Sequence, residues 1–185
     1  NSPYCIIIAL INALKGNFPA YVSSLTKLTK LDLSNNQLSG EVPMGISSLS
    51  SLTKLDISNN RLTDDPTNSL TGLFNLEDLA LGGNMFIISD INGMLQNFNN
   101  IKILNIADLG LQNIPAKITA FPNLETLILD NNPIPANAFT NIANHPKLIV
   151  LSLSGMQLSQ IPSQVSQLTQ LTSLNLSNNN ITEQN

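Results

Sequence analysis

The stretch LTKLDLSNNQL, residues 28–38, returns almost unchanged as LTKLDISNNRL at residues 52–62. When its residues are numbered 1 to 11, large apolar residues stand at positions 1, 4, 6 and 11, and Asn stands at position 9. The template begins again at Leu76, Ile101, Leu124, Leu148 and Leu171, so successive starts are 24, 24, 25, 23, 24 and 23 residues apart. A period of this length indicates a repeat architecture, in which each unit buries its apolar face against its neighbours.

Positions 3 to 7 of the template alternate between polar and apolar residues, which is the period-2 pattern of a strand buried on one face. From Leu28 onward, all 28 apolar template positions hold Leu, Ile or Phe. Strands stacked at one per repeat form a parallel sheet with neighbours about 4.8 Å apart. The segments that return between strands then cover the other side, and their greater width bends the stack into an arc with the sheet on its concave face.

The first residues fit the template less well. Counting back 24 residues from Leu28 gives a degenerate repeat that starts at Tyr4, with template residues Ile7, Ala9, Asn12 and Leu14. Its outward strand positions would hold Cys and aliphatic residues, which is unusual for a solvated strand. A short capping helix, or an edge covered by another segment, is the alternative interpretation.

The return segments predict two kinds of convex element. An apolar residue followed by Pro occurs at residues 18–19, 42–43, 114–115 and 161–162, which favours extended or 3₁₀-like turns because Pro fixes φ and donates no hydrogen bond. Asp64-Asp65-Pro66 predicts an N-cap and a Pro at the first helical position, opening a short helix toward Leu73. Residues 89–90 and 135–143 are similar helix candidates.

These repeats resemble those of leucine-rich-repeat proteins over essentially the whole chain. The resemblance implies an α/β solenoid, a curved right-handed superhelix of about seven or eight repeats, with a concave parallel sheet and a convex face of short helices, 3₁₀ turns and loops. Repeat starts near 4, 28, 52, 76, 101, 124, 148 and 171 describe one domain over residues 1–185 without visible caps. LKGNFP at residues 14–19 and LSGEVP at residues 38–43 are similar to the plant-type repeat of receptor kinases and polygalacturonase inhibitors, whereas the repeats from Ile101 and Leu148 resemble a 23-residue class of bacterial and animal members.

Asn residues at position 9 predict a structural ladder. An inward amide can bond the backbone groups that lose their partners where each strand turns away, and buried backbone groups need partners. Leu109 and Met156 interrupt the ladder, so those two turns must satisfy their backbone differently. The ladder residues are Asn12, Asn36, Asn60, Asn84, Asn132 and Asn179.

Composition argues against several functions. Charged residues make up 11% of the chain, and its eight Lys and Arg form no basic cluster that could follow a nucleic-acid backbone. No window of 18 apolar residues predicts a membrane span. Cys5 has no second cysteine to pair with, and His145 stands in a column of Leu and Phe, which predicts a buried, neutral histidine. Without a phosphate loop, zinc spacing or nucleophile elbow, we expect no enzyme, no metal and no cofactor.

The outward strand positions define the surface that a partner could contact. Lys30 with Asp32, and Lys54 with Asp56, predict a charged, self-compensating lattice of exposed pairs that contribute little to stability. Aliphatic side chains gather over three adjacent repeats, which favours a contact site, although single scattered aliphatics are normal on a surface. The candidate partner-binding residues are Asp78, Ile103, Asn105, Ile128, Ile149 and Val150.

The predicted function is non-enzymatic recognition of a protein or peptide on the concave face. Resemblance to plant-type repeats and to bacterial surface proteins such as internalins implies an extracellular or cell-surface setting. A cytosolic scaffold or substrate-targeting domain of a larger effector or ligase is the alternative, as is a spacer in a longer array. The Asn175 and Asn180 sequons permit secretion without demonstrating it. Because the last repeat has no cap, Leu174, Leu176 and Ile181 should be partly exposed or covered by another chain, which would allow end-to-end self-association.

Overall fold

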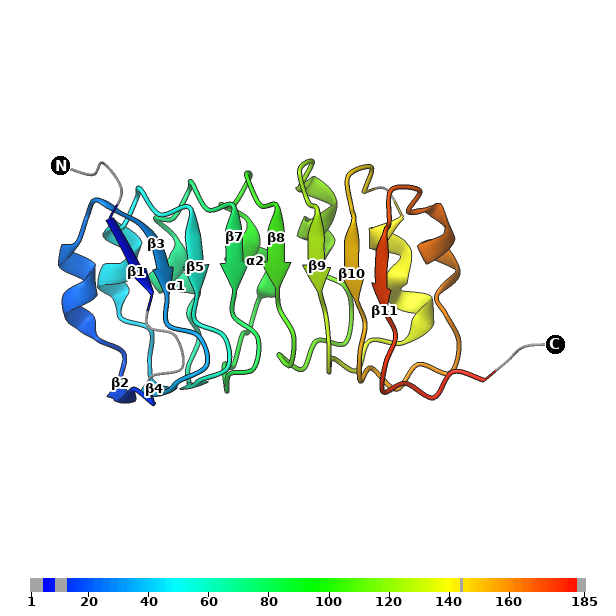
Figure 1. Cartoon of the computed structure of the whole chain (residues 1–185), viewed down its shortest axis with the longest axis horizontal. Helices are drawn as coiled ribbons and strands as arrows, with labels where there is room; N and C mark the ends of the chain where they lie inside the picture. The colour runs from blue at the N-terminus through cyan, green and yellow to red at the C-terminus, as the bar shows by residue number, and fades with distance from the viewer. Residues whose placement is uncertain (1–4, 9–12, 144, 183–185) are drawn as a thin grey trace.

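The chain forms a curved stack of repeats, each contributing one strand to a single parallel sheet. The computed structural model describes residues 5–8, 13–143 and 145–182. Eight strands lie side by side in the order of the sequence (Figure 1). They are β1 (Cys5–Ile8), β3 (Leu28–Asp32), β5 (Lys54–Asp56), β7 (Asp78–Ala80), β8 (Ile103–Asn105), β9 (Thr126–Ile128), β10 (Val150–Ser152) and β11 (Ser173–Asn175).

Neighbouring strands pair template position against template position, so the core forms as columns. Leu55, for example, lies opposite Leu31 on one side and Leu79 on the other, and all three are fully buried. β1 pairs with β3 in the same sense, with Ile7 opposite Leu31, so a strand rather than a capping helix occupies residues 5–8. Tyr4, Ala9 and Asn12 of the predicted first repeat lie outside the described residues.

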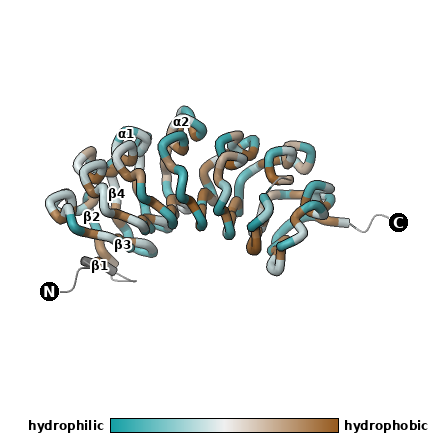
Figure 2. Tube along the Cα trace, turned by 90° about the horizontal axis from the view of Figure 1, so that it is seen from above, coloured by the Kyte–Doolittle hydropathy of each residue, from teal (hydrophilic) through white to brown (hydrophobic). Residues whose placement is uncertain are grey.

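The predicted convex elements are present, and Figure 2 shows them along the outer side of the arc with the strands on its inner side. Four 3₁₀ helices each begin directly after a proline: η1 (Ala20–Ser24), η2 (Met44–Ser48), η3 (Ala116–Ala120) and η5 (Ser163–Gln167). The other three are α1 (Thr67–Leu70), α2 (Ile91–Leu95) and η4 (Ala136–Ile142). The last of these is also a 3₁₀ helix, and its N-cap is again a proline, Pro135.

Asp65 fixes the start of α1 and ties it to the next repeat. The helix begins at Thr67 with Pro66 as its N-cap residue, one position later than the sequence indicates. The Asp65 carboxylate accepts hydrogen bonds from the Thr67 hydroxyl and N–H and, 24 residues further along, from the Ser89 N–H and hydroxyl. Partial burial raises the pKa of Asp65, but these hydrogen bonds outweigh it and lower the pKa to about 2. The ionised carboxylate therefore connects two neighbouring repeats through its hydrogen bonds.

A second, smaller sheet lies on one flank of the first repeats. Its parallel strands are β2 (Lys15–Asn17), β4 (Gln37–Gly40) and β6 (Arg61–Leu62). Gly16 and Gly40, the glycines of the plant-type segments, have φ of +87° and +74°, which side chains other than glycine rarely adopt. Further along, in the repeat from Leu124, Pro133 and Pro135 stand at the template positions of Gln37 and Ser39 of β4, and proline has no N–H to donate to such a ladder.

His145 lies in the core, as its column predicts. Its side chain is 4% exposed, and burial lowers its pKa against the opposing effect of a hydrogen bond with the Asn141 backbone. The Nε2 atom is buried without a hydrogen-bond partner among the described residues. A proton added there would therefore be an unsatisfied buried donor, so the neutral ring is favoured.

We expect His145 to make the fold less stable in mild acid. Because its folded-state pKa is lowered, the unfolded chain binds the extra proton first as the pH falls below the unfolded value of about 6.5. Stability should then drop between pH 7 and pH 5, and His145→Leu should flatten this part of the profile. Urea unfolding of both proteins at several pH values measures it, and parallel profiles would contradict the assignment.

Candidate partner-binding face

The concave face carries two rows of outward side chains. Template position 3 gives a row in which Asp78, Ile103, Thr126 and Val150 are successive neighbours across β7 to β10. Template position 5 gives the parallel row Ala80, Asn105, Ile128 and Ser152. Five of the six candidate residues therefore lie on adjacent strands of one sheet face. The sixth, Ile149, precedes β10 directly.

The aliphatic candidates are accessible to different degrees. Ile103 is 37% exposed and Ile149 is 40% exposed, whereas Ile128 and Val150 are partly exposed. The leucines between them, Leu104, Leu127 and Leu151, are fully buried on the opposite side of the same strands. The face therefore offers apolar surface that does not belong to the core.

Asn105 is less available than the sequence suggests. Its Oδ1 atom accepts a hydrogen bond from the Ala107 N–H at 3.1 Å, and a Cβ on Gly82 would lie only 2.6 Å from the same atom. The position-5 residues Asp32, Asp56 and Asn175 accept the N–H two residues ahead in the same way. The side chain of Asn105 thus caps its own strand end, and its amide oxygen is already engaged.

Lys54 lies among three carboxylates at the N-terminal part of this face. Its Nζ atom is 3.2 Å from Asp78, 3.8 Å from Asp32 and 3.9 Å from Asp56. The predicted Lys54–Asp56 pair is therefore present, but Asp78 on the next strand is closer. The predicted Lys30–Asp32 pair is wrong, because Lys30 forms no ion pair with any described residue and Asp32 lies near Lys54 instead. Directly opposite residues on neighbouring strands are about 4.8 Å apart, whereas positions 3 and 5 of one strand are about 6.6 Å apart, so Asp78, directly opposite Lys54, is its closest partner.

This arrangement leaves negative charge in excess. Burial raises the pKa of Asp78, and the carboxylates of Asp56 and Asp32 add to the increase, which together outweigh the attraction of Lys54. Burial would lower the pKa of Lys54, but attraction by Asp78, Asp56 and Asp32 raises it overall. The ammonium group is therefore held charged among carboxylates that it cannot all neutralise.

The asparagine ladder is engaged in backbone hydrogen bonds and so is not free for a ligand. Asn60 illustrates it: its Oδ1 atom accepts the Leu38 N–H at 3.0 Å, and its Nδ2 atom donates to the Leu33 carbonyl at 2.9 Å and the Ile57 carbonyl at 3.1 Å. Each amide thus joins its own turn to the turn of the preceding repeat. Asn36, Asn84, Asn132 and Asn179 do the same.

The two interrupted turns are satisfied by the next asparagine along the stack. Where Leu109 replaces Asn, Asn132 accepts the N–H groups of both Leu109 and Leu111, at 3.1 Å and 3.0 Å. Where Met156 replaces Asn, Asn179 accepts the N–H groups of Met156 and Leu158 in the same way. A turn that lacks its own Asn therefore depends on the Asn of the next repeat for two backbone hydrogen bonds.

Template position 8 is a column that the sequence analysis missed. Its residues have left-handed backbone conformations, with φ between 53° and 69°, a region open to Gly and tolerated by Asn and Asp. The signal was readable, because from Leu28 onward the column holds only these three residue types: Asn35, Asn59, Gly83, Asp108, Asn131, Gly155 and Asn178.

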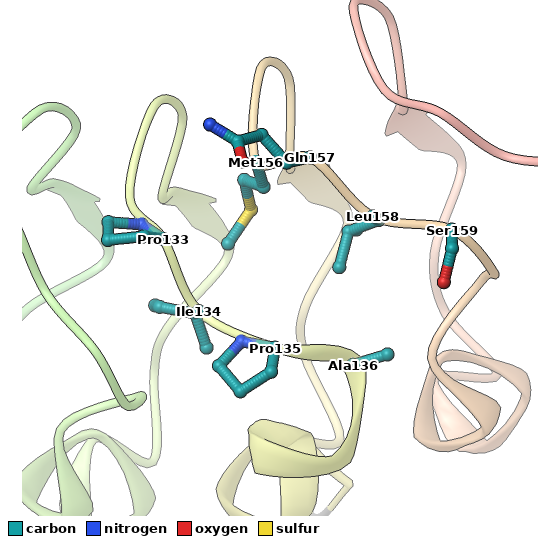
Figure 3. Close-up of a pocket in the computed structure, with 8 residues that line it drawn as sticks. All are labelled: Pro133, Ile134, Pro135, Ala136, Met156, Gln157, Leu158 and Ser159. Atoms are coloured by element: carbon teal, nitrogen blue, oxygen red, sulfur yellow. The ribbon is translucent and has the colours of Figure 1, made fainter.

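A shallow pocket of about 260 Å³ opens on the flank of the arc rather than on the concave face. Figure 3 shows residues 133–136 of one turn facing residues 156–159 of the next across it. The prolines there donate no hydrogen bonds, and the Ile134 N–H turns back to the Asn132 carbonyl, so the two turns do not pair. Its lining is mostly apolar and carries no titratable group.

The residues that the structure describes form neither a metal site nor a membrane-spanning helix. No group of three or more His, Cys, Asp or Glu side chains there has a geometry that could hold a metal ion. None of the helices in the same residues has the length and apolar character needed to cross a membrane.

Comparisons with known proteins give consistent matches for the fold. Residues 26–72 match a model of two leucine-rich repeats, and residues 167–183 match a model of one. No curated protein sequence matches the chain significantly.

Solved structures of plant and bacterial proteins superpose on most of the chain. The ectodomain of the Arabidopsis thaliana receptor kinase GASSHO1/SCHENGEN3, solved with CASPARIAN STRIP INTEGRITY FACTOR 2, is 30% identical over 90% of this chain, with a TM-score of 0.70. The plant peptide hormone receptor RGFR1, solved with RGF2, is 25% identical over 95%, with a TM-score of 0.72. A leucine-rich-repeat protein of Leptospira interrogans is 32% identical over 88%, also with a TM-score of 0.72.

The chain spans only 20%, 30% and 40% of these three solved chains, respectively. The match therefore concerns the repeat architecture rather than the whole of any of these proteins. Together with the period of the sequence and the stacked parallel strands, the matches identify the chain as a leucine-rich-repeat protein.

Proposed function

We propose that the chain is a non-enzymatic recognition module that holds a protein or peptide segment on its concave sheet. The observation that carries this proposal is the aliphatic surface of Ile103, which is exposed, and of Ile128 and Val150, which are partly exposed, placed over fully buried leucines on three adjacent strands. Interfaces draw most of their binding energy from a few desolvated apolar anchors, with polar surroundings that exclude water. The polar neighbours Thr126 and Ser152 supply such surroundings.

The setting we propose is extracellular or at a cell surface. The similar plant structures support it, because one is the ectodomain of a membrane receptor kinase and the other is a peptide hormone receptor, each solved with its factor or hormone. The scarcity of basic residues supports a protein or peptide partner rather than nucleic acid. A cytosolic scaffold or targeting domain remains the alternative, and a leader sequence or catalytic domain in the encoding gene distinguishes the two.

Substitutions on the aliphatic surface test the proposal. Ile103→Asp and Ile128→Asp should each weaken binding of peptides selected on this chain from a displayed random library by more than about 1 kcal/mol, or at least fivefold. Thermal stability should change little, since neither side chain is part of the core columns. Isothermal titration and fluorescence polarisation measure the affinity.

Ile87→Asp is the matched control, because it makes the same substitution at a side chain that is 76% exposed and lies between β7 and α2, outside the concave sheet. Its affinity should stay within about twofold of the unmodified chain. Unchanged binding in the Ile103→Asp/Ile128→Asp double variant, with the fold verified by circular dichroism, would place the interaction elsewhere on the solenoid.

A further inference from the structure

The acidic part of the concave face, formed by Asp32, Asp56 and Asp78, borders directly on its aliphatic part. The aliphatic part is formed by Ile103, Ile128 and Val150. Asp78 on β7 lies opposite Ile103 on β8, so the last carboxylate and the first exposed aliphatic side chain are immediate neighbours in one row. In the adjacent row the neighbouring residue is Ala80, and beyond it Gly82 carries no side chain. Ala80 and Gly82 are themselves buried, so the accessible surface at this border belongs to Asp78 and Ile103.

The acidic part has unused capacity to accept hydrogen bonds. The Oδ1 atoms of Asp32 and Asp56 accept the hydroxyls of Ser34 and Ser58 at 2.7 Å and 2.6 Å. Their Oδ2 atoms lie 3.8 Å and 3.9 Å from Lys54 Nζ, which is beyond hydrogen-bond distance. Among the described residues, Lys54 is the only cation within ion-pair distance of these carboxylates, so one positive charge faces the three negative charges of Asp32, Asp56 and Asp78.

The remaining lysine of this region does not restore the balance. Lys30 lies opposite Lys54 on β3, on the side away from Ile103, and forms no ion pair with a described residue. The face therefore changes from negative to apolar in the direction from β5 to β10. This asymmetry gives an incoming chain a defined direction and position.

We propose that the partner of this face is an extended segment in which a Lys or Arg side chain stands beside aliphatic ones. The basic group is received by Asp78 and Asp56, and the aliphatic groups cover Ile103, Ile128 and Val150. A cation there relieves the repulsion among the carboxylates, whereas an acidic segment adds to it and is rejected. The inference rests on the proposed use of the concave face for binding and adds the chemistry of the ligand.

The spacing of the strands sets the spacing within that segment. From β7 to β8 is one strand separation, about 4.8 Å, and from β7 to β10 is three, about 14 Å. An extended chain that crosses the strands advances about 3.3 Å per residue. The basic residue should therefore stand one or two positions from the first aliphatic residue and about four from the last.

Peptides selected on the unmodified chain from a displayed random 12-residue library provide the test. We expect the enriched peptides to combine Lys or Arg with Ile, Leu or Val at this spacing. Asp78→Asn should weaken their binding at least fivefold and reduce its dependence on salt concentration, because it removes the charge while keeping the shape. Asp56→Asn provides a second variant, and Glu41→Gln, an exposed residue just after β4, is the control that should leave affinity unchanged.

The outcomes separate this inference from the proposed function. Peptides whose binding is lost in Ile103→Asp but kept in Asp78→Asn and Asp56→Asn would overturn the basic ligand and leave the concave face as the binding surface. Selected peptides without an excess of Lys and Arg would do the same. If no selected peptide is weakened by Ile103→Asp, the proposed function fails, and the inference with it.

Discussion

Replacing Asn132 by alanine should lower the free energy of unfolding by about 3–5 kcal/mol, a large effect for one polar side chain. Asn132 is fully buried and makes its four shortest hydrogen bonds to backbone groups: it accepts from Leu109 and Leu111 and donates to the carbonyls of Ile106 and Leu129. Alanine leaves all four without this partner, and each unsatisfied buried group costs about 1–3 kcal/mol before water or rearrangement compensates.

Asn131→Gly is the matched control for this prediction. Asn131 is the exposed neighbour with φ of +56°, a conformation that glycine adopts without strain, so the change should alter stability by less than about 1 kcal/mol. Chemical unfolding followed by circular dichroism measures both variants. Equal losses for the two would show that the buried amide of Asn132 contributes no more than its exposed neighbour.

The stacked architecture also predicts which part of the chain loses stability when Asn132 is replaced. Stability in such a stack is a sum of repeat and nearest-neighbour terms, and Asn132 connects the repeat from Leu124 to the one from Ile101. Its loss should weaken that single boundary and allow the two parts of the arc to unfold less cooperatively. Hydrogen exchange should therefore increase first in the amides of residues 106–111.

The sheet, the core columns and the turns after proline were predictable because each depends on residues within one repeat. A strand with Leu on one face forms wherever the template occurs, and a proline sets the local φ whatever surrounds it. His145 was predictable for the same reason, since its column is filled with Leu and Phe elsewhere and the structure buries it. Residue patterns that lie within one repeat, and that recur in register, therefore determine most of this fold.

The features that sequence reasoning missed arise between repeats. The cross-strand approach of Lys54 to Asp78 depends on strand register, and the sharing of Asn132 by two N–H groups depends on what the preceding repeat lacks. The flanking sheet of β2, β4 and β6 needs consecutive repeats whose turns can pair. Such pairings join residues 20 or more positions apart, so a single repeat gives no sign of them.

The last two strands of the described sheet, β10 and β11, offer a comparison at one template position. Leu151 on β10 is fully buried between its neighbours, whereas Leu174 on β11, directly opposite it, is 38% exposed. Leu151→Ala should lower the free energy of unfolding by about 3 kcal/mol, because it removes buried methyl groups and leaves a cavity. Leu174→Ala should cost about 1 kcal/mol, since its side chain is already partly hydrated and no cavity closes over it.

Measuring both variants over a range of protein concentrations also tests end-to-end contact, because association that covers Leu174 would add a concentration-dependent stabilisation. For an isolated chain, the difference of about 2 kcal/mol between the variants should be independent of concentration. If Leu174→Ala costs as much as Leu151→Ala at high concentration and light scattering detects dimers there, a second chain covers the last strand. Equal costs in a dilute monomer would contradict the exposure of Leu174, because a side chain that faces water on one side has less contact to lose.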